Sequence, residues 1–442
     1  MFARRSRGLR SVPEPVVMTQ AASRSPILIG ASWYFLEKSA RLLGSFLIGA
    51  WVARHLGPEG YGTLAYALAL VAVLSFLGSL GIESLVVRDL VEAKRDPRHV
   101  VSTYFFTRLA GAFAVPVLAA AYVMLTHAHD RLLLVLAIIC SGAVLMGAFD
   151  AADCWLQSRN QARSTSIIRL IGFVVGALSR CLFILSDASV NWFAIVVLIE
   201  SIVVAALYWR ILHRNNLAPS LRYVSRGELK HQVLAGKMMV LSGLTVAIYS
   251  KVDVLVVGAL LSKEALGSYA IAASMCAAWN MVGMSLVQAW APRISAAMVQ
   301  GQSAYLSAMR QVLAVALAVS LGGSFLLCLA SEMIFSLLLG PSYAAGADVF
   351  KVLVWSSVFV FLGVATSQII VNERLYWVSF ARTTTGLIAC LVLMSFADAN
   401  WKAVDFAFLM ILTSALATSA IVFSTQARKT LQQVLRPAQI PT

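Results

Sequence analysis

Twelve apolar segments, each about long enough to cross a lipid bilayer, follow one another along this 442-residue chain. A membrane-spanning helix needs about 20 predominantly apolar residues, because its length must match the hydrocarbon core. A soluble protein is about 25% charged, whereas only 12% of these residues are charged. The sequence therefore predicts an all-α polytopic membrane protein with twelve transmembrane helices. The segments lie at about 28–53, 61–87, 101–126, 132–157, 164–186, 191–211, 233–260, 266–290, 307–331, 347–371, 376–396 and 402–425.

Basic residues concentrate in every second connection between these segments. The connections that alternate with these carry only Arg54, Arg131, Lys263 and Lys402. Lysine and arginine gather on the cytoplasmic side of a membrane protein, so we expect a multi-pass protein of the inner membrane with both termini in the cytoplasm. The net charge of +15 comes from these topology signals, and no nucleic-acid partner is expected because no nucleic-acid-binding motif accompanies them.

The chain divides into two similar halves. LGPEGYGTLAYA at 56–67 parallels LSKEALGSYAIA at 261–272, so that Gly62 corresponds to Gly267. Both halves begin on the same side of the membrane, which makes the repeat parallel, with its pseudo-twofold axis along the membrane normal. Two such six-helix bundles facing a central cavity are a transporter architecture. The predicted parts are a disordered basic tail (1–25), an N-terminal bundle (26–211), a cytoplasmic linker (212–231), a C-terminal bundle (232–425) and a second cytoplasmic tail (426–442).

Charged residues interrupt several of the apolar segments. A charge at membrane depth costs about 2.5–3.5 kcal/mol on insertion scales, so it usually faces a water-filled cavity or a partner. The predicted cavity cations are Lys38, Arg41, Arg108, Arg180 and Lys251. The alternative is internal pairing, for example of Arg180 with Glu200, while Arg169 is expected only to reach the nearby membrane surface.

Acidic residues inside the segments are candidates for carrying a coupling ion, because a carboxylate in the membrane can bind a proton. The candidates are Asp253, Glu200, Asp150 and Asp153. The alternative role for each is that of a structural partner for a cation. No metal or other cofactor is expected beyond H⁺ or Na⁺ as the coupling ion.

Three stretches carry a resemblance to a known family: ARHLGPEGYGTLAYALALVAVLSFLGSLGIESLVVRDL at 53–90, YSKVDVLVVGALLSKEALGSYAIAASM at 249–275, and LLLGPSYAAGADVFKVL at 337–353. With them the chain resembles the Wzx-type polysaccharide (O-antigen) flippases of the multidrug/oligosaccharidyl-lipid/polysaccharide exporter superfamily. The resemblance implies a V of two six-helix bundles that flips undecaprenyl-diphosphate-linked oligosaccharide for surface polysaccharide biosynthesis. It also implies membrane lipids, a polysaccharide polymerase and chain-length machinery as partners.

Three other functions compete with this one. A drug or cation exporter of the same superfamily would be expected to present an acidic cavity, whereas the mid-depth charges here are more cationic. A lipid II flippase is another alternative, but its relatives typically carry more than twelve spans. A membrane-embedded polymerase or ligase would need a large periplasmic loop, and every outer connection here is short, so we expect no enzyme.

Overall fold

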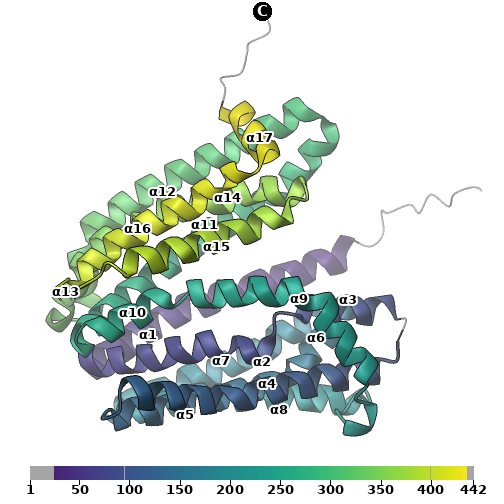
Figure 1. Cartoon of the computed structure of the whole chain (residues 1–442), viewed down its shortest axis with the longest axis horizontal. Coiled ribbons are helices and arrows are strands. Elements are labelled where there is room, and N and C mark those ends of the chain that lie inside the picture. Colours follow the sequence, from purple (N-terminus) through teal and green to yellow (C-terminus); the bar gives the residue numbers. More distant parts are fainter. Residues whose placement is uncertain (1–23, 94, 399, 436–442) are drawn as a thin grey trace, which may run out of the picture.

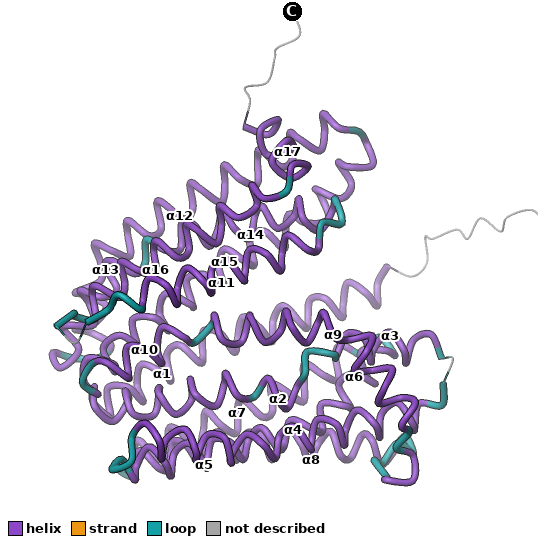
Figure 2. The backbone as a smooth tube through the Cα atoms, viewed as in Figure 1, coloured by secondary structure: helices purple, strands orange, loops and turns teal. Residues whose placement is uncertain are grey.

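The computed structural model describes residues 24–435 except 94 and 399, and within these residues every regular element is a helix (Figure 2). The elements of the N-terminal half are α1 (Arg24–Leu74), α2 (Phe76–Ser79), α3 (Glu83–Glu92), α4 (Pro97–Thr126), α5 (Arg131–Met146), η1 (Gly147–Asp150), α6 (Ala151–Ser158), α7 (Ala162–Leu185) and α8 (Val190–Arg214). Those that follow are η2 (Leu221–Tyr223), α9 (Arg226–Tyr249), α10 (Val252–Leu260), α11 (Lys263–Gln300), α12 (Gln302–Leu338), η3 (Pro341–Tyr343), α13 (Ala344–Leu353), α14 (Ser356–Asn372), α15 (Tyr376–Met394), α16 (Ala403–Ser419), η4 (Ala420–Phe423) and α17 (Thr425–Leu435).

The predicted fold class, an all-α polytopic membrane protein, is confirmed. Among the described residues, nine helical stretches are long and apolar enough to cross a membrane, or eleven if each of two bent helix pairs is one span. The predicted number of twelve is not confirmed. One of the nine stretches, Gly44–Glu92, covers part of the first predicted span and all of the second, and α1 is kinked within it where Gly57 has a non-helical backbone (φ 68°, ψ 172°).

Three of the predicted spans are broken rather than continuous. The second ends early, because Leu80 (φ 53°) and Gly81 (φ 63°) adopt left-handed backbone conformations between α2 and α3. The seventh bends by 42° between α9 and α10, and the tenth by 44° between α13 and α14. Hydropathy reports the length of an apolar segment but not its backbone, so these breaks were not predicted.

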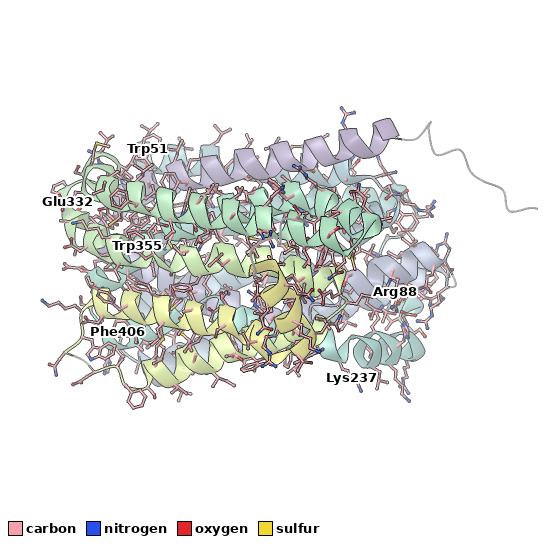
Figure 3. All side chains as sticks on the ribbon, turned by 90° about the horizontal axis from the view of Figure 1, so that it is seen from above. Trp51, Arg88, Lys237, Glu332, Trp355 and Phe406 are labelled. Atoms are coloured by element: carbon pink, nitrogen blue, oxygen red, sulfur yellow. The ribbon has the colours of Figure 1, made fainter. Side chains whose placement is uncertain are left out.

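The helices form two bodies that meet at one end and diverge at the other (Figure 1). Elements α10 and α13 lie at the narrow end, and α3, α17 and the start of α1 lie at the wide end. In the view from above, Arg88 lies toward the wide end, opposite Glu332 and Phe406 (Figure 3). The basic connections thus gather at the end where the two bodies separate.

The buried core follows the same V. At the narrow end one apolar cluster joins both halves, and it includes Val52 and Tyr66 of α1 together with Val257 and Phe335. Two further clusters lie apart from each other toward the wide end. One belongs to the N-terminal half, with Tyr104 at its centre, and the other to the C-terminal half.

The repeated glycines lie face to face at the narrow end. A Cβ atom on Gly62 would collide with the carbonyl oxygen of Lys263, and one on Gly267 would collide with that of Pro58. The absence of a side chain lets α1 and α11 cross backbone to backbone here. The Lys263 ammonium also lies 2.7 Å from the Asp130 carboxylate, so contacts between the halves hold this end closed.

Candidate functional site

A cavity of about 1040 Å³ lies between the two halves. Helices α1 and α11 provide most of its wall, and α7, α9, α10, α13, α14 and α16 complete it. Its polar lining includes Ser45, Tyr61, Tyr249, Ser250, Ser274, Asn280, Ser356 and Ser414. The charged residues among those that line it are Arg41, Arg169, Lys251 and Asp253. Three positive side chains against one negative give the cavity a cationic character.

Arg41 and Arg169 lie at the same level on one wall of the cavity. Helices α1 and α7 run in the same direction, and they touch at Gly44, where an added Cβ would lie 2.6 Å from the ring of Phe173. Arg41 precedes Gly44 by three residues, and Arg169 precedes Phe173 by four. With a rise of about 1.5 Å per residue, the backbone positions of both arginines lie about one helical turn from this contact.

Arg169 is fixed from behind by a buried carboxylate. Its Nη2 lies 2.6 Å from Oδ2 of Asp153, which also accepts a hydrogen bond from Gln157 Nε2 at 3.0 Å. The Asp153 side chain is only 6% exposed, whereas that of Arg169 is 37% exposed. The Arg169 guanidinium therefore reaches the cavity, whereas the sequence predicted that it would reach the membrane surface.

Lys251 and Asp253 reach the same cavity because the helix is broken between them and α9. In a straight helix two residues so spaced point to different faces, but Ser250 and Lys251 separate α9 from α10. Asp253 is buried, and its Oδ2 accepts a hydrogen bond from the Tyr269 hydroxyl at 3.1 Å. Lys251 is exposed. The sequence could have predicted this arrangement only if a feature of it had indicated a helix break within the seventh predicted span.

Arg108 lies away from the residues that line the cavity, inside the N-terminal half. Its Nη1 lies 3.3 Å from Glu83 and 2.7 Å from the Tyr104 hydroxyl, and its Nη2 lies 3.2 Å from Asp150. The side chain is only 9% exposed. The structure thus joins one predicted cavity cation to one predicted coupling acid in a buried ion pair.

Arg180 and Glu200 form another such pair between α7 and α8, with Nη2 and Oε2 3.2 Å apart. Neither is among the lining residues. Of the predicted cations, the structure therefore brings Arg41 and Lys251 to the cavity. The side chain of Lys38 lies outside the described residues.

A second, apolar pocket of about 200 Å³ adjoins the main cavity. It is lined by Phe46 of α1, Met275, Ala278, Trp279 and Val282 of α11, Leu327 and Ile334 of α12, and Phe350 of α13. Phe46, Met275 and Ala278 line both spaces. A polar chamber and an apolar one therefore share a wall. No cluster of His, Cys, Asp or Glu arranged to hold a metal ion occurs in the described part of the chain.

The family model described as "Polysaccharide biosynthesis protein" matches residues 51–348, more than half of the chain. The chain belongs to this family. The predicted membership in a polysaccharide biosynthesis family is thereby confirmed. No curated protein matches the sequence of this polysaccharide biosynthesis family member.

Solved structures of transporters share its fold. An inward-facing multidrug resistance MATE family transporter of the MOP superfamily has a TM-score of 0.68 at 15% identity, over 93% of this chain and 99% of the other. The lipid II flippase MurJ in an inward closed conformation has a TM-score of 0.67 at 11% identity, over 92% and 90%. The MATE multidrug transporter DinF-BH has a TM-score of 0.62 at 16% identity, over 93% and 97%. At these identities the likeness shows the fold alone.

Proposed function

We propose that this protein flips undecaprenyl-diphosphate-linked oligosaccharide repeat units across the inner membrane for surface polysaccharide biosynthesis. The observation that carries the proposal is the cavity between the halves, whose charged lining is three cations and one carboxylate. In this role the protein would act beside a polysaccharide polymerase and chain-length machinery. Its basic wide end, with both termini, would face the cytoplasm.

The cationic lining fits the part of such a substrate that is hardest to move. The polyprenyl tail can stay in lipid, but the diphosphate is multiply negative, and burying an isolated charge costs tens of kcal/mol in the Born limit. A hydrated cavity with fixed cations lowers that barrier. Arginine suits a phosphate because its planar fork binds two oxygens, whereas lysine acts as a point charge.

The placement of the cations supports binding between the halves. Arg41 and Arg169 belong to α1 and α7 of the N-terminal half, and Lys251 follows α9 of the C-terminal half. A diphosphate held by all three would draw the halves together. We infer alternating access, in which the narrow end opens outward as the wide end closes around the head group.

Asp253 is the carboxylate that we propose for ion coupling, because it is the acid among the lining residues. A proton or sodium ion bound there would lower the negative charge of the cavity wall and favour an anionic substrate. The Asp253→Asn variant is expected to flip substrate without responding to an imposed H⁺ or Na⁺ gradient. An undiminished gradient response in this variant would rule out Asp253 as the coupling site.

Two related functions share parts of this geometry. A drug or cation exporter has the same fold in MATE transporters, but the excess of positive lining disfavours a cationic substrate. A lipid II flippase also handles a polyprenyl diphosphate, and MurJ shares the fold. The charge of the cavity therefore favours a polyprenyl-diphosphate substrate. A transport assay that distinguishes the two flippase functions must compare substrates with different glycans.

Surface polysaccharide export in cells tests the proposal. Arg41→Ala should abolish export at normal protein levels, because it removes a guanidinium from the diphosphate site. Arg41→Lys should retain part of it, since the charge remains. Arg214→Ala is the matched control, because Arg214 is an exposed arginine at the end of α8, outside the cavity lining. Wild-type export by a well-expressed Arg41→Ala variant would contradict the proposed role of this residue.

A further inference from the structure

The connection between α8 and α9, residues 215–225, is bound along one side to the N-terminal half. Its Ser220 amide donates a hydrogen bond to Ser102 Oγ at 3.3 Å. Its Ser225 amide donates another to Thr103 Oγ1 at 3.2 Å. Both acceptors belong to the second turn of α4. The connection therefore runs back along this helix from the wide end.

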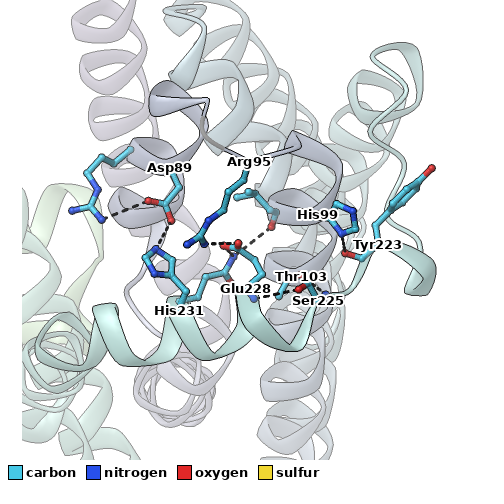
Figure 4. A network of polar contacts seen from close by, with 11 residues as sticks. Asp89, Arg95, His99, Thr103, Tyr223, Ser225, Glu228 and His231 are labelled. Atoms are coloured by element: carbon cyan, nitrogen blue, oxygen red, sulfur yellow. Dashed lines mark hydrogen bonds and ion pairs between the residues drawn. The ribbon is translucent and has the colours of Figure 1, made fainter.

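The first turns of α9 continue this attachment (Figure 4). Glu228 forms an ion pair with Arg95, and the Glu228 side chain is only 4% exposed. His231 Nε2 lies 3.1 Å from Oδ2 of Asp89 in α3. The connection and the start of α9 thus present one fixed side to the N-terminal half, and their other side is left to the surroundings.

The outward side combines apolar and basic side chains. Three apolar side chains are 72%, 37% and 39% exposed there: Leu221, Val224 and Leu229. The exposed bases among them are Arg222, Arg226 and Lys230. In the part of the chain that the structure describes, none of these three bases pairs with a carboxylate. We call these six residues the linker surface.

The linker surface lies close to the level of an exposed tryptophan. Thr103, which holds the connection, precedes Phe105 by two residues, about 3 Å along α4. The ring of Phe105 lies 5.1 Å from that of Phe149, which in turn lies 6.0 Å from that of Trp209. Trp209 is exposed near the end of α8. Because tryptophan gathers at the interface between membrane and water, this level is that of the lipid head groups.

We propose that the linker surface binds an anionic phospholipid of the leaflet at the wide end. Its three bases contact the phosphate and the charged head group, and its three apolar side chains lie among the nearest acyl carbons. An interfacial protein segment has this composition, because apolar side chains enter the lipid while bases beside them attract anionic head groups. The site is separate from the cavity, since none of the six residues lines it.

The charge of the linker surface selects the class of lipid. Glu228 is the one acidic residue in the stretch from 222 to 230, and it is turned inward to Arg95. The outward side is therefore positive without compensation. A zwitterionic lipid would bring an ammonium group to these bases together with its phosphate, whereas an anionic lipid brings a net negative charge. Because the opposite side is fastened to α3 and α4, the bound lipid holds the N-terminal half at the membrane surface.

Native mass spectrometry of the purified full-length protein tests the inference, with phosphatidylglycerol as the anionic probe and phosphatidylcholine as the zwitterionic one. The test variant removes the three bases: Arg222→Gln/Arg226→Gln/Lys230→Gln. We expect at least a fivefold loss of affinity for phosphatidylglycerol and less than a twofold change for phosphatidylcholine. The matched control removes three exposed bases of the C-terminal half: Arg374→Gln/Arg428→Gln/Lys429→Gln. It should change neither affinity more than twofold.

No transport substrate takes part in this measurement, so its result is independent of the proposed function. Wild-type protein that binds phosphatidylglycerol no better than phosphatidylcholine overturns the inference. An unchanged affinity in the test variant does so too, because the linker surface would then not be the site. Equal losses in the test and control variants also overturn it, because any positive charge on the protein would then suffice.

Fluorescence quenching tests the apolar part of the site and does not depend on how well the charge variants fold. A fluorescent amino acid in place of Leu221 is read in proteoliposomes that contain phosphatidylglycerol. Phospholipid with a spin label near its head group should quench the emission, and iodide in the water should quench it little. Stronger quenching by iodide than by the labelled lipid would place the linker surface in water and contradict the proposal.

Discussion

In the N-terminal half, arginines within the helices are paired with carboxylates: Arg108 lies against Glu83 and Asp150, Arg169 against Asp153, and Arg180 against Glu200. In the C-terminal half, two charges are paired with neutral groups instead. Asp253 accepts a hydrogen bond from the Tyr269 hydroxyl, and Arg382 Nη1 donates to the Gly363 carbonyl at 2.9 Å. The two halves share a repeat but not an interior chemistry.

This difference explains why position inside a span does not by itself identify a cavity residue. Arg108 and Arg180 lie with their partner carboxylates away from the cavity lining, inside the N-terminal half. A charge reaches the cavity where its partner lies behind it, as Asp153 lies behind Arg169, or where the helix is broken, as at Lys251.

The largest effect is expected from removing Arg108, which is buried, and Arg382, which is half-buried. Arg108→Gln should lower the free energy of unfolding by about 3–5 kcal/mol, because two carboxylates lose their buried partner. Arg382→Gln should cost about 1.5–3 kcal/mol, the range of a charged hydrogen bond to a neutral acceptor. Chemical unfolding in detergent measures both. Equal costs would show that the two interiors do not differ as described.

The second largest effect is expected at Gly62, which the sequence repeat matches with Gly267. Gly62→Ala should reduce export about tenfold, because a methyl group would push α11 away from α1 at a cost of about 1–3 kcal/mol. Gly322→Ala is the control, since an added Cβ there meets nothing within 4 Å. The measurement is export at matched protein levels, and equal activity of the two variants would refute a closed crossing at Gly62.

A smaller effect is expected at the carboxylate behind the cavity cation. Asp153→Asn should lower the free energy of unfolding by about 1–3 kcal/mol, because Arg169 loses a charged partner. Asp253→Asn should cost less, since an amide oxygen can still accept from Tyr269. Thermal unfolding of both variants checks the order, and the reverse order would mean that the Arg169–Asp153 pair contributes little.

The smallest effect is expected at the ion pair that joins the halves. Burial raises the pKa of the Asp130 carboxyl, but hydrogen bonds from Lys263 and the Leu133 amide outweigh it and hold the pKa below its usual range. Such a carboxyl group stabilises the folded state at pH values above its unfolded pKa of about 3.9. This stabilisation is lost as the pH falls through the pKa of the group in the folded state. Asp130→Asn should cost less than about 1 kcal/mol at neutral pH.

The pH dependence distinguishes this pair from a merely local one. The stability difference between wild type and Asp130→Asn should persist from pH 7 to about pH 4 and shrink below it. Asp348→Asn is the control, because Asp348 lies 3.1 Å from Lys351 within a single helix, α13. Melting temperatures of the three proteins across this range provide the measurement. A difference that grows as the pH falls would contradict the assigned sign.

Hydropathy was enough to predict the fold class, because a bilayer fixes the length and composition of every spanning helix. The repeat matched Gly62 with Gly267, and the structure shows that these two glycines also meet in space, a contact that the sequence did not predict. The sequence did not predict the helix breaks within the spans. A helical wheel drawn through 233–260 puts Lys251 and Asp253 on different faces, whereas the break before α10 brings both to the cavity.

The pairing of Arg180 with Glu200 was one of the alternatives that the sequence left open, but the partners of Arg108 and Arg169 were hidden for a different reason. Periodicity gives the face of one helix on which a residue lies, but not which neighbour packs against that face. Glu83 and Asp150 reach Arg108 from two other elements, and this depends on the packing of the whole half. Arg169 lies near the start of the fifth predicted span, close to the membrane surface, and the sequence did not show that Asp153 would pack behind it beside the cavity.

Flipping in reconstituted liposomes tests the central claim most directly, with a defined undecaprenyl-diphosphate-linked oligosaccharide and the Arg41→Ala/Arg169→Ala double variant beside wild type. The account predicts that wild-type protein moves the lipid-linked oligosaccharide between leaflets and that the double variant, folded and inserted equally, loses at least nine-tenths of that rate. A double variant as fast as wild type, or a wild-type protein that moves a cationic drug but not the lipid, would contradict it.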